Sequence, residues 1–486
     1  MRPFEIALSI AIFSCVLFLL SPIRNAGRWV HLLPFLALSI AVIQVLIEGH
    51  RWQMFPAYAL VGALVLSECK GWAKPFQPSF IIGLAALSCL VAAVLLSTIL
   101  PVFELPALTG PYKVGTETRE ITDWSRRDPF SPRPADPRRL MIQFWYPAEA
   151  SARGRLAPYR DKGTTTLWNR RYTLAKTNSM LNVPVFPSAD KYPVLVYVPS
   201  WWGLRTDNTV QVEYLASHGY VVVAIDHPYS SSIVSFPDGS VIRTRLLAHE
   251  SYSSQVSFEA FLNAAQQEVR IRADDAEFVL NTLKTLNEND SRGLFTGKLD
   301  LSRVGIFGFS LGGAVAAEAS WLDPRFKAGI NMDGMVAGES AQKGTRAPFL
   351  LMFEDDQLLA VGDISKLDST SRREAVFNSE QDQLMKKSLS EFGGYYMLIP
   401  RVLHNDFSDA PYYSPLARLT QTGPVNAKRV SSLIDSFSLA FFDKFLRGRS
   451  GSSFDGLLSE FPEVRLQTWK VPGRTIQPSK EQDSQH

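Results

Sequence analysis

The feature that most constrains the fold is a run of 21 uncharged, mainly apolar residues at positions 80–100. An α-helix rises about 1.5 Å per residue, so a run of this length spans the roughly 30 Å hydrocarbon core of a bilayer. Three more apolar runs precede it, at residues 6–20, 30–47 and 54–66, and the third is the least certain span because it is short. We therefore expect residues 1–104 to form a bundle of about four transmembrane helices.

The first apolar run could also be a cleaved signal peptide. Against this, Glu5 lies early in the run and no small-x-small cleavage pattern follows Leu20. A signal peptide would also leave the three later runs unexplained. Integral membrane helices account for all four runs together.

Positive charges near the ends of the runs predict the orientation. Arg24 and Arg28 follow the first run and Lys70 and Lys74 follow the third, whereas the loop between the second and third runs offers Arg51 beside Glu48. Positive loops stay in the cytoplasm, so the first and third loops are expected there. With four spans, the chain leaves the cell membrane on its extracytoplasmic side, and the large domain is expected there. If the third run does not cross, the orientation reverses.

The rest of the chain is balanced in charge. The first hundred residues hold six of the 50 Lys and Arg and three of the 47 Asp and Glu, so the net charge of +3 resides there. A neutral remainder without basic runs argues against nucleic acid and favours a neutral or zwitterionic substrate. We expect neither a metal nor another cofactor. Cys15, Cys69 and Cys89 all lie in the apolar part, so the remainder cannot form a disulfide of its own.

From about residue 110, short apolar runs alternate with helical stretches, which predicts an α/β fold with a mainly parallel central sheet and flanking helices. We assign residues 105–470 to this catalytic domain, and residues 471–486 to a polar, disordered tail. Strands are expected at 140–146, 194–198, 220–225, 303–308, 326–332, 348–353 and 395–399, and helices near 265–286, 311–321 and 428–446.

One serine lies in the setting that a nucleophile elbow requires. Residues 308–312 read Gly-Phe-Ser-Leu-Gly, preceded by an apolar strand and followed by a helix rich in small residues. The elbow is so tight that glycines fit best two positions before and after the serine. This pattern predicts an α/β-hydrolase fold with Ser310 as its nucleophile.

A serine hydroxyl needs a base that removes its proton during attack. In this fold the base follows the nucleophile in the chain. Beyond Ser310 stand only His404, on a loop after the strand expected at 395–399, and His486, at the end of the polar tail. We therefore predict His404 as the base.

The residues alone leave the triad acid open. Asp333 follows the strand after the nucleophile helix, and Asp355 and Asp356 follow the next strand. A carboxylate at either strand end could orient the histidine ring.

The oxyanion hole should combine two backbone amides. One belongs to Leu311, directly after the nucleophile, and the other to the loop after an earlier strand, where Trp202 is the expected donor. Trp201, Phe309 and His227 are expected to line the substrate pocket.

Taken together, these motifs resemble the platelet-activating-factor acetylhydrolase family, the plasma and intracellular type II enzymes and their bacterial relatives, over about residues 110–446. One departure is Ser200-Trp201-Trp202 where family members often carry a histidine, and another is the four-helix leader. The resemblance rests on Gly-Pro-Tyr-Lys-Val-Gly at 110–115, Gln-Phe-Trp-Tyr-Pro at 143–147, Trp202-Gly203, the elbow at 308–313, Met332-Asp333-Gly334, and His404 with Phe407 and Asp409.

The resemblance implies that Asp333 is the triad acid. It also implies a metal-independent serine esterase that removes short or oxidised acyl chains from phospholipids, in the manner of a phospholipase A2. A general carboxylesterase, a polyesterase or a peptidase of the same fold remains an alternative. A second alternative, which is not an enzyme, is a membrane protein that uses a hydrolase fold for binding or sensing.

Overall fold

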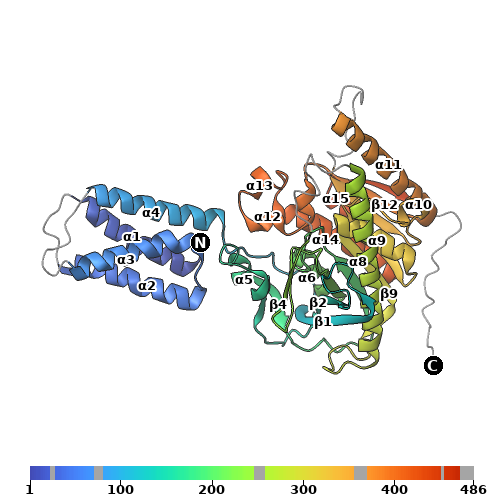
Figure 1. The fold of residues 1–486 in the computed structure, drawn as a ribbon, viewed down its shortest axis with the longest axis horizontal. Helices are drawn as coiled ribbons and strands as arrows, with labels where there is room; N and C mark the ends of the chain where they lie inside the picture. The colour runs from blue at the N-terminus through green and yellow to red at the C-terminus, as the bar shows by residue number, and fades with distance from the viewer. Residues whose placement is uncertain (22–27, 71–79, 246–257, 355–368, 450–453, 471–486) are drawn as a thin grey trace. The chain divides into compact units, whose positions relative to one another are not determined.

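The computed structural model describes the chain apart from residues 22–27, 71–79, 246–257, 355–368, 450–453 and 471–486 (Figure 1). The expected disordered tail is the last of these ranges and so lies outside the described residues. The chain divides into two compact units. The first comprises Met1–Glu104, Pro158–Lys176 and Pro411–Ala417, and the second comprises Leu105–Ala157, Thr177–Ala410 and Arg418–His486.

The four long helices of the first unit are α1 (Pro3–Leu20), α2 (Leu33–Glu48), α3 (Phe55–Lys70) and α4 (Phe80–Ile99). Among the described residues, three helical segments are long and apolar enough to cross a membrane: Pro3–Leu20, Trp29–Glu48 and Phe80–Ile99. The expectation of four spans is therefore corrected to three candidates. With 16 residues, α3 is about 24 Å long, short of a roughly 30 Å hydrocarbon core.

The helices of this unit run in alternating directions. At one end, buried Arg51, just before α3, donates 2.7 Å and 2.6 Å hydrogen bonds to Glu5 near the start of α1. Arg51 also donates to the carbonyl oxygen of Leu100, just after α4, at 2.7 Å. At the opposite end, His31 before α2 lies 3.2 Å from Glu68 near the end of α3. The end of α1, the start of α2, the end of α3 and the start of α4 therefore lie at one end of the bundle.

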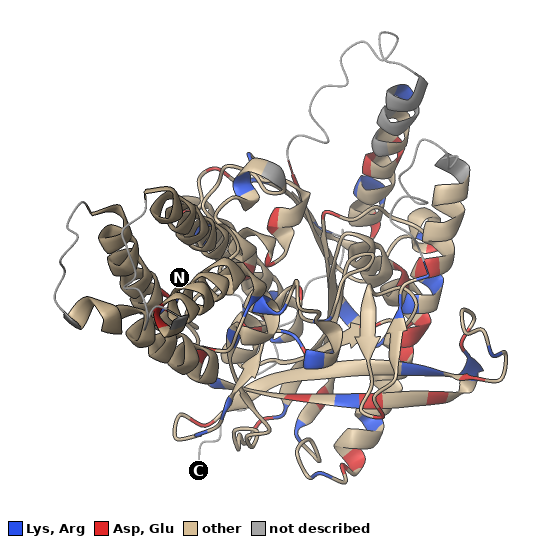
Figure 2. Cartoon of the chain, turned by 60° about the vertical axis from the view of Figure 1, so that its left-hand side comes forward, with Lys and Arg blue, Asp and Glu red and all other residues tan. Residues whose placement is uncertain are grey.

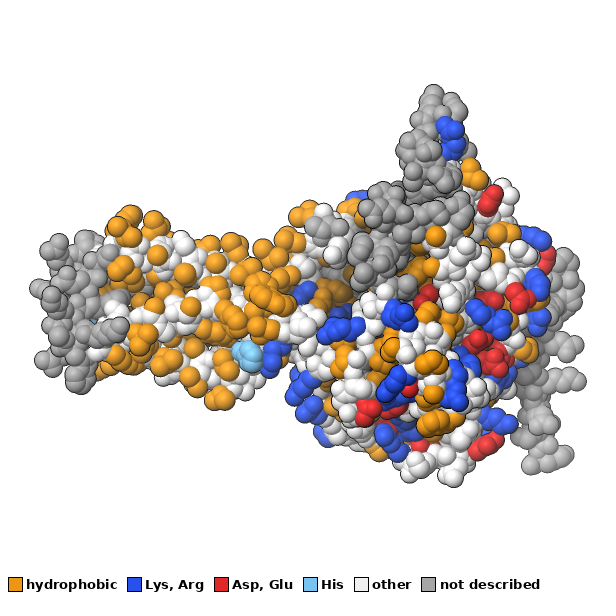
Figure 3. Space-filling model, viewed as in Figure 1, with side chains coloured by type: hydrophobic (Ala, Val, Ile, Leu, Met, Phe, Trp, Pro, Cys, Tyr) orange, Lys and Arg blue, Asp and Glu red, His pale blue; other side chains and the backbone are white. Residues whose placement is uncertain are grey.

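Apolar side chains cover the outside of this bundle. Ile10, Leu17, Leu46 and Ile81 are each more than half exposed, and hydrophobic side chains cover the visible face of these helices (Figure 3). The charged residues, by contrast, gather on the second unit, and the helices carry few of them (Figure 2). An apolar exterior of this extent is typical of helices that face lipid.

A single sheet of eleven strands organises the second unit, in the order β13-β12-β11-β10-β9-β5-β6-β2-β1-β4-β3. From β6 to β12 each neighbouring pair is parallel, and β2 and β13 run antiparallel to the parallel strands beside them. The parallel core confirms the expected α/β class. Its strands are β5 (Tyr192–Val198), β6 (Val221–Asp226), β9 (Leu299–Phe309), β10 (Phe326–Met332), β11 (Phe349–Glu354) and β12 (Gly394–Ile399).

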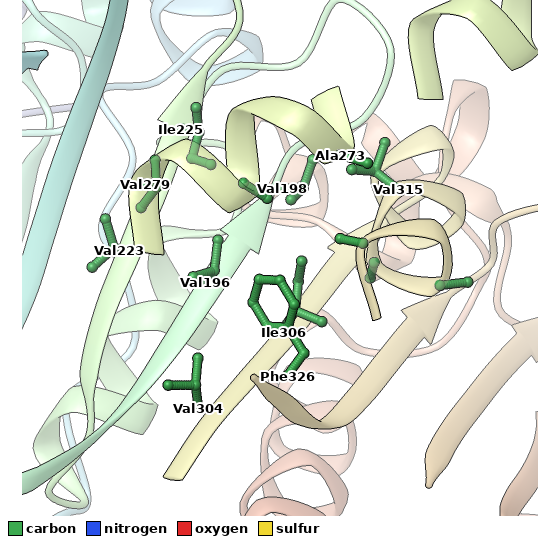
Figure 4. Packing of buried hydrophobic residues seen from close by; sticks show 14 of the residues in the cluster. Val196, Val198, Val223, Ile225, Ala273, Val279, Val304, Ile306, Val315 and Phe326 are labelled. Atoms are coloured by element: carbon green, nitrogen blue, oxygen red, sulfur yellow. The ribbon is translucent and has the colours of Figure 1, made fainter. Parts of the chain in front are cut away.

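Both faces of the parallel core of this sheet are buried, which is why its strands are mainly apolar. Val196 and Ile306 point to the face covered by α8 (Phe258–Glu288) and α9 (Leu311–Leu322), where they join one cluster of buried side chains (Figure 4). Their neighbours Tyr197 and Phe307 belong to the cluster on the other face, under α6 (Thr209–Ser217) and α14 (Ala427–Leu446). The alternation follows from the two-residue repeat of a strand.

The structure also contains elements that the sequence patterns did not predict. The largest are β1 (Lys113–Arg127), which pairs antiparallel with β2 (Pro137–Ala148), and α11 (Ser369–Phe392). The others are β3 (Leu156–Pro158), α5 (Arg171–Leu174), β4 (Lys176–Leu181), β7 (Ile233–Ser235), β8 (Val241–Arg243), α10 (Ser340–Lys343), α12 (Ala410–Tyr413), α13 (Ala417–Thr420), α15 (Phe454–Glu460) and β13 (Arg465–Trp469).

Candidate active site

Ser310 occupies a sharp turn between β9 and α9. Its backbone has φ 57° and ψ −126°, a conformation that non-glycine residues rarely adopt and that costs about 1–3 kcal/mol. Glycines make the turn possible: a Cβ at Gly308 would lie 2.1 Å from the carbonyl oxygen of Gly312. This close approach is the physical reason for the glycine spacing, and it lifts the hydroxyl of Ser310 off the carboxyl edge of the sheet.

His404 begins a short 3-10 turn, His404–Phe407, after β12. The turn is tied down by two carboxylates that follow in the chain. Asp406 accepts hydrogen bonds from the amides of Leu403 and Gly423, at 2.8 Å and 2.7 Å. Asp409 accepts from the amide of Thr209 at 2.7 Å, at the start of α6. Because of these contacts the loop holds its histidine in one place, although the side chain of His404 is 41% exposed.

Asp333 lies just past the end of β10, with φ 56°. The side chain of Asn331 shapes this turn by accepting from the amide of Gly334 at 2.8 Å and donating to its carbonyl oxygen at 2.9 Å. One carboxylate oxygen of Asp333 accepts from the amide of Glu354 at 3.2 Å. The other carboxylate oxygen is left to face His404.

The structure brings Ser310, His404 and Asp333 into one hydrogen-bonded chain. His404 Nε2 lies 3.0 Å from Ser310 Oγ, and His404 Nδ1 lies 2.5 Å from Asp333 Oδ2. The carboxylate at Nδ1 favours the tautomer with its proton on that nitrogen, so that Nε2 can accept the serine proton. This arrangement can activate a hydroxyl for attack on a carbonyl carbon.

The loop after β5 reaches the nucleophile because α9 begins directly beside it. A Cβ at Gly312 would lie 2.1 Å from the carbonyl oxygen of Val198, the last residue of β5. This approach sets the first turn of α9, which begins at Leu311, beside the start of the loop that leads to Trp202. The amide of a first helical residue has no acceptor within its own helix and is available to a ligand.

The predicted pocket residues occupy different environments. The indole rings of Trp201 and Trp202 stack at 5.5 Å between centroids and an interplanar angle of 17°. The ring of Phe309, 4% exposed, lies 4.8 Å from that of His404 and supports it from the core. His227 differs from the expectation that it lines the pocket: it is fully buried, and its Nδ1 lies 2.8 Å from Asp275. Burial lowers the pKa of His227 to about 4, so the ring is neutral.

The two alternative acids, Asp355 and Asp356, lie outside the described residues. The sequence analysis assigned no role to the side chains that hold the site in shape, Asn331, Asp406 and Asp409 among them. A usable signal was present: each is a short polar residue within five positions of Asp333 or His404, where loops depend on such side chains to satisfy backbone amides.

Comparison with known proteins identifies the family. Residues 98–450 match the family model described as platelet-activating factor acetylhydrolase, isoform II. The chain belongs to this family. A probable 1-alkyl-2-acetylglycerophosphocholine esterase from Arthroderma benhamiae is 26% identical to this hydrolase over 407 residues, which cover 77% of this chain and 96% of the relative. The platelet-activating factor acetylhydrolase of Cavia porcellus is 21% identical over 364 residues, 70% of this chain and 78% of the relative.

Among solved structures, this chain resembles a ferulic acid esterase from Streptomyces cinnamoneus, with a TM-score of 0.59 and 29% sequence identity. The likeness covers 75% of this chain and 99% of the esterase. Both comparisons confirm an α/β-hydrolase-like fold. The chain is a hydrolase of the 1-alkyl-2-acetylglycerophosphocholine esterase type.

Replacing Asp333 by Asn tests the contact at Nδ1. An amide can present its N–H₂ group to the ring and favour the wrong tautomer, so we expect kcat to fall about 10⁴-fold while the protein still folds. Steady-state kinetics on p-nitrophenyl esters measures this. Asp355→Asn and Asp356→Asn are the matched controls, and a comparable loss in either of them, with Asp333→Asn active, would refute the prediction.

Proposed function

We propose that this hydrolase cleaves carboxylic esters through an acyl-enzyme formed on Ser310, with His404 as general base and acid and Asp333 as the residue that orients it. The observation that carries the proposal is the pair of hydrogen bonds linking the three side chains, at 3.0 Å and 2.5 Å. Residues 105–470 act as the catalytic domain.

In the first half-reaction, Ser310 Oγ attacks the ester carbonyl carbon as His404 Nε2 takes its proton. The tetrahedral intermediate collapses, the alcohol leaves with the proton from His404, and the acyl group stays on the serine oxygen. In the second half-reaction, His404 removes a proton from water, and the resulting attack releases the carboxylic acid and regenerates Ser310. Asp333 stays ionised and stabilises the imidazolium that forms in each half.

The amides of Leu311 and Trp202 form the oxyanion hole in this proposal. Leu311 supplies a first-turn helical amide, and the close approach of Gly312 to Val198 supports the placement of both donors on one side of Ser310 Oγ. Loss of one such donor costs about 10²–10³ in kcat in a comparable hydrolase.

The substrate we propose is a phospholipid with a short or oxidised acyl chain. The family and the named activities of the relatives support it. The stacked indoles of Trp201 and Trp202 are proposed to form a wall of the acyl pocket, and Phe309 to back His404. An apolar bundle in the same chain brings such an enzyme to a lipid surface.

A second candidate substrate is an ester of an aromatic acid. The stacked tryptophans provide a flat apolar surface for an aromatic acyl group. The resemblance to a ferulic acid esterase favours the same possibility.

For localisation we propose a multi-pass protein of the cell membrane. Its catalytic domain lies on the extracytoplasmic side on the condition that α3, whose 16 residues leave it outside the three candidate spans, crosses together with its neighbours; with three spans the domain lies in the cytoplasm. The end of α1, the start of α2, the end of α3 and the start of α4 lie at one end of the bundle, and the sequence next to these helix ends carries Arg24, Arg28, Lys70 and Lys74. At the other end, Arg2 and Arg51 are paired with Glu5 and Glu48. The unbalanced positive charge therefore marks the first end as cytoplasmic.

Cys69, at the exposed end of α3, tests this orientation. We expect a membrane-impermeant maleimide to leave Cys69 unlabelled in intact cells and to label it after permeabilisation, with Cys69→Ser as the control that stays unlabelled. Cys15 is buried, and Cys89 lies within apolar α4. Full labelling in intact cells would contradict the proposal.

The function itself is tested by Ser310→Ala in the full-length protein. We expect the turnover of p-nitrophenyl acetate to fall on the order of 10⁵–10⁶-fold, because no nucleophile remains to accept the acyl group. Ser302→Ala removes an exposed hydroxyl from the same strand and should keep full activity. Undiminished activity in Ser310→Ala would refute the assignment.

Turnover measurements on other esters separate the candidate substrates. Phospholipids with graded sn-2 chains should be cleaved fastest when the chain is short, whereas a preference for methyl ferulate would favour the aromatic ester. If the wild type neither turns over any ester nor reacts at Ser310 with a fluorophosphonate probe, the result supports the alternative of a non-catalytic membrane protein.

A further inference from the structure

The loop after β5 makes a tight turn that includes the proposed oxyanion donor. The amide of Gly203 donates to the carbonyl oxygen of Ser200 at 3.0 Å, which closes a four-residue turn around Trp201 and Trp202. Trp202 has φ 60°, in the left-handed region where turns usually place glycine or asparagine. A tryptophan remains in this conformation when surrounding contacts enforce it, and such strain occurs often at functional sites.

One set of contacts comes from the segment after β6. The amide of Ser232 donates to the carbonyl oxygen of Trp202 at 2.8 Å, and Trp202 forms an isolated parallel bridge with Ser231. These contacts fix the plane of the peptide that follows Trp202. The plane of the peptide before it, which contains the Trp202 amide, depends on the preceding residues.

Arg272 of α8 holds those preceding residues. Its Nη1 donates to the carbonyl oxygens of both Pro199 and Ser200, at 3.0 Å and 3.1 Å. These two consecutive carbonyls directly precede the Trp201–Trp202 pair. A single guanidinium nitrogen that binds both of them sets the direction in which the chain enters the turn.

Burial and hydrogen bonds hold the side chain of Arg272 in place. Its side chain is fully buried, Nε donates to Ser230 Oγ at 2.9 Å, and Nη2 donates to the same oxygen. Ser230 in turn donates to Glu268, one helical turn before Arg272 on α8. Burial lowers the pKa of Arg272, but a guanidinium starts so high that it keeps its charge. Arg272 therefore joins the segment after β5 to the segment after β6.

We propose that Arg272 is a positioning residue for the oxyanion hole: by binding the carbonyls of Pro199 and Ser200, it orients the amide of Trp202 toward the developing oxyanion. The proposal rests on the proposed function, since it assigns a role within the same ester hydrolysis. Arg272 touches neither Ser310 nor His404 in the contacts described, so its effect reaches the reaction through the loop. Such an effect falls on the transition state and leaves substrate binding unchanged.

The test uses full-length Arg272→Lys and Arg272→Ala in detergent micelles. We expect kcat for p-nitrophenyl acetate to fall about 10–100-fold, with KM changed by less than about twofold, because the misplaced amide still leaves one oxyanion donor. The affinity for a trifluoromethyl ketone, whose adduct places an oxyanion in the same hole, should fall by the same factor as kcat/KM. Added guanidinium at millimolar concentration should restore part of the activity of Arg272→Ala.

Arg119→Ala is the matched control. Arg119 is also a buried arginine of the second unit, held by Glu117 and Asp290, and it forms no described bond to the loop after β5. We expect it to lower the melting temperature while kcat and trifluoromethyl ketone affinity stay unchanged, with no response to guanidinium. Arg272→Lys retains the charge and provides the folded variant if Arg272→Ala does not fold.

The positioning role is refuted if folded Arg272 variants keep wild-type kcat, or if kcat falls without a matching loss of trifluoromethyl ketone affinity. Equal losses in Arg119→Ala would refute it too, because they would indicate a general effect on the fold. Failure of the proposed function itself is distinguishable, since wild-type protein would then not react with a fluorophosphonate at Ser310, whatever the Arg272 variants do.

Discussion

The first turn of α9 lies against the end of β5 so closely that a Cβ at Gly312 would sit 2.1 Å from the Val198 carbonyl oxygen. A Cβ at Gly308 would meet the carbonyl oxygen of Gly312 at the same distance. At both positions there is room only for the hydrogen atoms of glycine. The close packing brings β9, which precedes Ser310, the helix α9 and the loop after β5 together. The hydroxyl of Ser310 and the amide of Leu311 therefore lie at the carboxyl edge of the sheet beside the end of β5, where α/β folds place their sites.

The rest of the site is built by loops that reach this point from β10 and β12. The turns that carry Asp333 and His404 are each held by a polar side chain that bonds their backbone, Asn331 at the end of β10 and Asp406 in the turn after β12. Beneath the loop after β5, Arg272 does the corresponding work from α8. The strained backbone at Ser310, Asp333 and Trp202 is thus compensated locally by hydrogen bonds, while the two apolar faces of the sheet supply the stability.

The parallel core was predictable because its strands are apolar on both faces and its helices have a clear period. The elbow fixed Ser310 by its glycines, and chain order singled out His404. The acid was open from pattern alone, since two strand ends offered a carboxylate. In the structure Asp333 lies beside the ring of His404, whereas Asp355 and Asp356 lie outside the described residues. The third apolar run was the least certain of the four expected spans, and the helix that contains it has 16 residues, about 24 Å, which is short of a roughly 30 Å hydrocarbon core.

Arg272 illustrates what sequence patterns hide. On α8 it shares the buried stripe of Ala265, Val269 and Ala276, where a charge conflicts with the apolar period. Such a conflict signals a buried network. The partners of Arg272, the carbonyls of Pro199 and Ser200, are backbone groups about 70 residues away, which side-chain patterns cannot predict.

The most direct test of the account is to trap the covalent intermediate. Purified full-length protein is mixed with a phospholipid that carries an sn-2 acetyl group, quenched in acid within milliseconds, and digested for mass spectrometry. The account predicts a peptide that carries one acetyl group on Ser310, formed before steady-state release of acetate. If acetate is released with Ser310 unmodified throughout, or if the acetyl group is found on another residue, the central claim is contradicted.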